Sequence, residues 1–212
     1  MRSLLLTALC AVAIAPAACA QDGMDMGSDE PVAAGVFADA PPRASDEARV
    51  SPNGYAGTTV GTADVLVQYG RPSLRGRAYF ADGAELAPAG AVWRTGANEA
   101  ATVTFTGDVR VEGEPVPAGT YALFTVPGDG EWTVILNKTA QQWGSFRYDE
   151  AEDQLRVTVA PMTDAPMQEQ FEIRFEDVTD DEATMVLHWG TVGVPVVIAE
   201  AGGMDMDEMD DM

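Results

Sequence analysis

The sequence predicts an all-β protein, an antiparallel β-sandwich of about ten strands with a disordered tail at each end. Two observations support this prediction. Apolar and polar residues alternate in several short runs, which is the pattern of strands with one buried face. Turn residues follow these runs at short spacing without a long helical period between them, which disfavours a parallel βαβ arrangement.

Six runs carry the alternation, with an apolar residue at every second position: 102–106, 109–111, 132–136, 155–159, 171–175 and 185–189. Turn segments that contain glycine lie close to these runs, at residues 106–108, 112–114, 127–130 and 189–191. Short strands with turns at this spacing are typical of two packed antiparallel sheets. We therefore expect one β-sandwich domain over residues 50–199.

The length and charge of the chain limit the classes of function that it can have. The chain has 212 residues, which suits one domain with tails, and its hydrophobic fraction of 46% excludes wholesale disorder. It has 12 Lys and Arg against 34 Asp and Glu, a formal net charge of −22. Such a surface repels phosphates, so we expect neither a nucleic-acid partner nor binding to an anionic membrane. No sequence motif indicates a cofactor.

The first 20 residues have the pattern of a secretory signal peptide. Arg2 precedes an apolar run that is too short to span a bilayer, and Ala18-Cys19-Ala20 fits a cleavage site before Gln21. Alternatively, Cys19 is the lipidated first residue of a lipoprotein. Cys10 and Cys19 are the two cysteines, so the exported domain would have no disulfide. We expect a periplasmic or extracellular protein with no later membrane span.

Both tails are predicted to be disordered: residues 21–49 as an acidic linker and residues 200–212 as a tail rich in Met and Asp. Thioethers select Cu(I), so the carboxyl-terminal tail contains weak candidate metal ligands, namely Met204, Met206, Met209 and Met212. The alternative, which we favour, is a solvating tail, because copper-binding tails usually interleave histidine and His188 is the only histidine. In the domain itself we expect no metal site.

Polar residues gather in three segments, 69–77, 92–100 and 136–144. Cationic residues that cluster in an otherwise acidic chain indicate a specific role. Binding of an anionic ligand is one such role, because arginine binds carboxylates in bidentate fashion. Tryptophan could stack on a flat ligand, and asparagine and glutamate supply mixed donors and acceptors. The candidate ligand-binding residues are Arg71, Arg77, Trp93, Arg94, Asn98, Glu99, Lys138 and Trp143. The alternative is a structural role, with the arginines paired to carboxylates and both tryptophans in the core.

These segments resemble a known family. WRTGANEA at residues 93–100 and VPAGTYALFTVPGDGEWTVILNK at residues 116–138 are similar to the bacterial "domain of unknown function 2911" family. Arg71-Pro72 and Gly76-Arg77 also match, whereas Gly70 and Arg75 replace the usual serine and lysine. The resemblance covers roughly residues 55 to 198 and implies an exported protein, but no particular reaction.

We expect a module that binds a small molecule, a sugar or a carboxylate, without catalysis. One alternative is a hydrolase-like enzyme in which Glu99 is the general acid or base. Another is a structural envelope protein with metal-binding tails. His188 follows the alternation of its run, so we expect it to face solvent rather than to serve a catalytic triad. The oligomeric state stays open.

Overall fold

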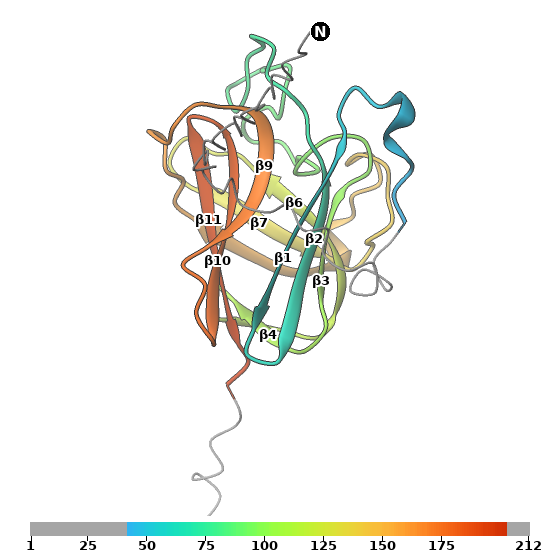
Figure 1. Cartoon of the computed structure of the whole chain (residues 1–212). Helices are drawn as coiled ribbons and strands as arrows, with labels where there is room; N and C mark the ends of the chain where they lie inside the picture. The colour runs from blue at the N-terminus through green and yellow to red at the C-terminus, as the bar shows by residue number, and fades with distance from the viewer. Residues whose placement is uncertain (1–41, 203–212) are drawn as a thin grey trace, which may run out of the picture. The chain divides into compact units, whose positions relative to one another are not determined.

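A computed structural model describes residues 42–202, whose eleven strands form two antiparallel sheets (Figure 1). The six-stranded sheet has the order β1-β2-β3-β6-β7-β8, and the five-stranded sheet has the order β5-β4-β11-β10-β9. The strands of the first sheet are β1 (Asn53–Val60), β2 (Ala63–Gly70), β3 (Ala101–Phe105), β6 (Gly119–Val126), β7 (Trp132–Asn137) and β8 (Asp153–Val159). Those of the second are β4 (Val109–Val111), β5 (Glu114–Val116), β9 (Gln168–Glu176), β10 (Glu182–Gly190) and β11 (Val192–Glu200).

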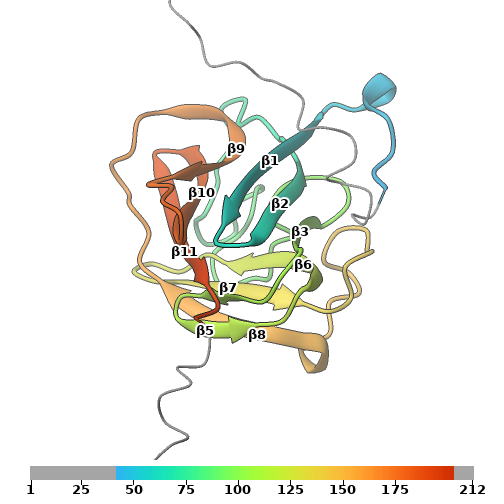
Figure 2. The same cartoon turned by 60° about the horizontal axis from the view of Figure 1, so that its bottom comes forward.

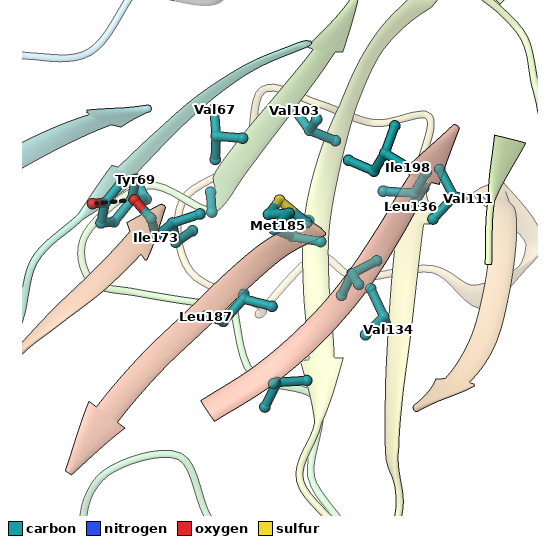
Figure 3. Close-up of a cluster of buried hydrophobic side chains, with 14 of the residues drawn as sticks. Val67, Tyr69, Val103, Val111, Val134, Leu136, Ile173, Met185, Leu187 and Ile198 are labelled. Atoms are coloured by element: carbon teal, nitrogen blue, oxygen red, sulfur yellow. Dashed lines mark hydrogen bonds between the residues drawn. The ribbon is translucent and has the colours of Figure 1, made fainter. Parts of the chain in front are cut away.

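The two sheets face each other (Figure 2). The side chains on their inner faces form the main hydrophobic core. Figure 3 shows Val67, Val103 and Leu136 of the first sheet beside Met185 and Ile198 of the second. Burial of this apolar surface supplies the main favourable free energy of folding, since the domain has no cysteine. The hydroxyl of Tyr69 crosses between the sheets and donates to the carbonyl oxygen of Ile173 at 3.2 Å.

The predicted β-sandwich is confirmed, and the six alternating runs coincide with strands. The β2 strand has no simple alternation, because seven of its eight residues are buried. Its outer face is covered, as is that of β3, whereas the other neighbour, β1, has exposed residues on its outer face. A second, smaller core packs on the outer face of the first sheet and consists of Ala100, Ala122, Phe124 and Ile135, with Val92, Val126 and Tyr148 against it.

Residues 42–49 differ from the disordered linker predicted for 21–49. They include the 3-10 turn η1 (Asp46–Ala48), and Arg43 and Arg49 bond to the loop before β3. Side-chain ion pairs fix this segment, which the low hydrophobicity of the linker does not reveal. In both views it lies on the same side of the first sheet as the loop after β7 (Figures 1 and 2). The predictions for residues 1–41 and 203–212, including the tail methionines, fall outside the described residues.

Candidate functional site

The segment WRTGANEA forms an irregular loop between β2 and β3 rather than a strand. It is tied to β6 at its start, where Trp93 and Thr125 exchange backbone hydrogen bonds of 2.7 and 2.9 Å. Gly96 adopts φ of +143°, and a Cβ there would lie 2.7 Å from the carbonyl oxygen of Gly70. The close approach of the two backbones therefore requires glycine, and it brings the first predicted polar segment against the second.

A cavity of about 180 Å³ opens beside this loop, and Arg94 lines it. The other lining residues are Pro72, Glu85, Leu86, Ala87, Pro88, Val92, Trp93, Gly96, Ser145 and Trp189. The Arg94 side chain makes no hydrogen bond or ion pair with any residue from 42 to 202, and its Nε is fully buried. Burial lowers the pKa of the Arg94 guanidinium, because desolvation disfavours the charged form. We call this space the Arg94 cavity.

Trp93 does not offer a free face for stacking. Its ring is stacked on Trp189 with centroids 5.7 Å apart and planes at 10°, and the edges of Phe80 and Phe171 close around it. Only 6% of Trp93 is exposed, so the ring belongs to the core and forms a wall of the cavity. Among the predicted roles, the structural alternative fits this tryptophan, since burial of a large aromatic surface is strongly favourable.

Arg77 is held by polar partners, unlike Arg94, whereas Arg71 resembles Arg94 in lacking a partner for its Nε. Arg77 pairs with Glu85 at 3.2 Å and donates to the carbonyl oxygens of Ser73 and Leu74. It therefore compensates the carboxylate that lines the Arg94 cavity. The aliphatic stem of Arg71 lies over Gly54, where a Cβ would come within 2.8 Å of it, and its Nε has no partner among the described residues.

Glu99 is the centre of an ion-pair cluster. Arg49 binds both carboxylate oxygens, with 2.7 Å between Nη1 and Oε2, and Arg43 lies 3.4 Å away. The hydrogen bond from Arg49 is the largest cause that lowers the pKa of Glu99 to about 2. The Arg43 side chain, 3% exposed, also donates to the carbonyl oxygen of Ala100 at 3.0 Å. A carboxylate held in this way is a weak base, which disfavours Glu99 as a general acid or base.

A second cavity of about 190 Å³ lies beside Glu99, and we call it the Glu99 cavity. It is lined by Pro42, Arg43, Glu99, Ala100, Thr102, Ala140, Gln141, Gln142 and Trp143. Trp143 is 59% exposed, unlike Trp93. The loop after β7 is fixed here because Gly144 donates its backbone N–H to the carbonyl oxygen of Asn98 at 3.1 Å.

The remaining predicted residues contribute to neither cavity. Asn98, at φ of +66°, donates its side-chain amide to the carbonyl oxygen of Ser51 at 3.0 Å and so fixes the loop. Lys138 is exposed, and its ammonium group forms no ion pair within residues 42–202. The structure thus places Arg94 and Trp93 in one cavity and Glu99 and Trp143 in the other, with Lys138 apart from both.

The prediction that His188 faces solvent is wrong: it is 6% exposed. Arg174 donates to its Nδ1 at 2.9 Å, so the ring is in the tautomer whose Nε2 donates to the carbonyl oxygen of Pro166, also at 2.9 Å. The chain between β8 and β9 covers this outer face of the second sheet, which strand periodicity alone does not reveal. Both ring nitrogens are engaged, so His188 is structural.

Sequence reasoning missed several residues of the two cavities. Arg43 and Arg49 stand in a segment otherwise rich in acidic and small residues, and that isolation was the available signal. The sequence gives no signal for the cavity residues Thr102, Ser145 and Trp189, because nothing in their local pattern separates them from ordinary strand or loop residues. Within residues 42–202, no group of three or more His, Cys, Asp or Glu could hold a metal ion. No helix of this part of the chain has the length and apolar character of a membrane span.

The described residues define an antiparallel β-sandwich with two small cavities at its polar loops. The chain belongs to the family described as "Protein of unknown function (DUF2911)", whose match extends over residues 51–198. The predicted resemblance is thereby confirmed, and the family assigns no reaction. No curated protein shows significant similarity to the chain, and neither does any solved structure.

Proposed function

We propose that the protein is an exported module that binds a small carboxylate in the Arg94 cavity, without catalysis. The observation that supports this most strongly is the Arg94 guanidinium, which lines the cavity and has no partner within residues 42–202. Arg43 and Arg49 bind Glu99, and Arg77 binds Glu85. The Nε of Arg71 also lacks a partner within residues 42–202, but Arg71 lines neither cavity. Arg94 has a donor fork and nothing in the described chain for it to bind.

Charge compensation is the physical basis of the proposal. A partly desolvated cation without an acceptor raises the free energy of the folded protein. A bound carboxylate would supply the missing negative charge and two acceptor oxygens for the guanidinium fork. Glu85 at the cavity wall does not take this role, because its carboxylate is paired with Arg77. The Ser145 side chain lines the same cavity and adds a hydroxyl group.

Size and wall chemistry favour a small carboxylate over a phosphate or a longer chain. The cavity of about 180 Å³ is close to the ~150 Å³ that accommodates benzene in a protein interior, and well below the ~300 Å³ of typical ligand pockets. Leu86, Val92 and Trp189 give it apolar walls, which suit the hydrocarbon part of an organic acid. A phosphate dianion would leave that surface unused and would require more than one unpaired cation.

Export is part of the proposal and rests on the sequence of the first 20 residues. Mass spectrometry of the mature protein from the producing cell distinguishes its two forms. A chain that begins at Gln21 indicates ordinary cleavage, and a chain that begins at a lipidated Cys19 indicates a membrane anchor. A chain that retains its leader in the cytoplasm contradicts export.

Isothermal titration calorimetry of the full chain with acetate, succinate and inorganic phosphate tests the binding. We expect the carboxylates to bind, and Arg94→Met to weaken binding about 10- to 100-fold, because hydrogen bonds to charged groups contribute about 1.5–3 kcal/mol. Arg94→Lys keeps the charge but loses the two-pronged donor group, so its affinity for carboxylates should lie between those of the wild type and Arg94→Met.

The matched control is Arg110→Met, which changes an exposed arginine of β4 whose side chain, within residues 42–202, bonds only to the carbonyl oxygen of Gly113. This variant should bind as the wild type does. Carboxylate affinity that Arg94→Met leaves unchanged would overturn the assignment, as would a complete absence of binding heat with every carboxylate. Binding of phosphate alone would replace the proposed ligand class.

A further inference from the structure

We propose that the Glu99 cavity is a second ligand site, which accepts a neutral sugar ring against Trp143. The proposal does not depend on carboxylate binding, because the two cavities share no lining residue. Three features of the cavity support it: unsatisfied polar groups on its floor, an exposed aromatic face at its edge, and an ion pair that is already balanced.

The floor of the cavity contains polar groups without partners. Thr102 lines the cavity, and its hydroxyl makes no hydrogen bond with residues 42–202. The Oε1 atom of Gln142 is fully buried and lacks a partner among the described residues, whereas the amide nitrogen of Gln142 donates to the carbonyl oxygen of Thr139 at 2.7 Å. Buried polar atoms are normally satisfied, and each exception needs an explanation such as a bound ligand. A hydroxyl-rich ligand would satisfy both, since each hydroxyl donates and accepts.

Trp143 supplies the second feature. The backbone of Trp143 forms an antiparallel β-bridge with that of Glu99, yet Trp143 is 59% exposed. Three of the four tryptophans, Trp93, Trp132 and Trp189, are almost fully buried, so this exposure is a departure within the same protein. An indole fixed beside a polar cavity offers a flat apolar surface of the kind that packs against the C–H face of a sugar ring.

The electrostatics select a neutral ligand. Glu99 is ionised and bonded to Arg49 and Arg43. Asp46 acts electrostatically on both arginines as a second negative charge, so the charges of the cluster compensate one another within the protein. An anion would compete with Glu99 for these arginines, and a cation would compete with them for Glu99. A neutral ligand binds without breaking the cluster, and planar groups such as the Glu99 carboxylate still accept hydrogen bonds from hydroxyls. The volume of about 190 Å³ suits a single ring.

The test uses the tryptophan itself. Intrinsic fluorescence of the full chain is recorded during titration with glucose, galactose, mannose and N-acetylglucosamine, and binding is measured independently by ligand-observed NMR. We expect at least one pyranose to bind and to shift the emission of Trp143, while mannitol, an open-chain polyol, has no effect. Trp143→Ala and the isosteric Thr102→Val should each weaken binding about fivefold to tenfold, as expected for loss of one stacking or hydrogen-bonding group.

Two controls separate this site from the Arg94 cavity and from misfolding. Arg94→Met should bind the sugar like the wild type. The Trp143 and Thr102 variants should unfold cooperatively in urea like the wild type, which shows that they are folded whether or not the protein binds carboxylates. The proposal is overturned if none of the four sugars binds. It is equally overturned if Trp143→Ala or Thr102→Val leaves the sugar affinity unchanged.

Discussion

The Arg94 cavity and the Glu99 cavity are similar in size, at about 180 and 190 Å³, but their arginines are held in opposite ways. Arg43 and Arg49 share the carboxylate of Glu99, whereas Arg94 has no acceptor within residues 42–202. The comparison shows that a buried arginine does not by itself indicate a ligand site. Removal of the counter-charge of a compensated arginine is costly, whereas a buried arginine without a counter-charge raises the free energy of the folded protein.

The largest effect should follow from removing the compensation at Glu99. Glu99→Gln leaves Arg43, whose side chain is 3% exposed, without its counter-charge and removes the bidentate bond to Arg49. We expect the free energy of unfolding to fall by about 2–3 kcal/mol, somewhat below the ~3–5 kcal/mol of a fully buried pair. Urea denaturation measures this change.

The matched control for that variant is Glu150→Gln, which alters a carboxylate that is 75% exposed and 4.0 Å from Arg156. Its effect should stay within about 0.5 kcal/mol, as is usual for surface pairs. Equal effects of the two substitutions would mean that the Glu99 cluster does not hold the 42–49 segment in place.

The pH dependence of stability also tests the ion pairs of Glu99. The hydrogen bond from Arg49 lowers the pKa of Glu99 in the folded protein from its ordinary value of 4.5 to about 2. A depressed carboxyl pKa contributes stability that is complete above the unfolded pKa and is lost as the pH falls toward the folded value. The stability difference between wild type and Glu99→Gln should therefore be constant above about pH 5 and shrink between about pH 4.5 and pH 2. A difference that does not change over this range would contradict the depressed pKa.

Substitution of Arg94 should change the free energy of unfolding in the opposite direction to Glu99→Gln, and by a smaller amount. Arg94→Met keeps most of the aliphatic stem but removes a desolvated charge and a buried Nε without a partner. In the absence of ligand we expect stability to rise by up to about 1 kcal/mol. Arg110→Met provides the surface reference and should change little. A loss of more than about 1 kcal/mol in Arg94→Met would assign this arginine a structural role.

The sequence was most informative for strands that have one face on the main core and the other face in water. The alternation of β9, with Phe171 and Ile173 inward, predicted a strand. The prediction failed for His188 of β10, because a long connection covers the outer face and removes the expected exposure. The buried strand β2 likewise lacks alternation, since both of its faces are covered.

The sequence named candidate residues by their type but did not predict their arrangement. Trp93, Arg94, Glu99 and Trp143 do line cavities, yet in two separate pairs rather than one cluster. Which arginine is compensated depends on contacts across the fold, such as the 50 residues between Arg49 and Glu99. Local sequence contains no signal for such pairing, and this is why the roles of Arg43 and Arg94 required the structure.

We propose that the Arg94 charge stays uncompensated until a carboxylate binds. Urea denaturation of wild type and Arg94→Met, with and without succinate, tests it in one measurement. Without succinate the variant should be at least as stable as the wild type. With succinate at about 100 times its dissociation constant the wild type should gain about 2.7 kcal/mol and become the more stable protein. Two denaturation curves that keep their order, with equal shifts or none, would contradict the claim.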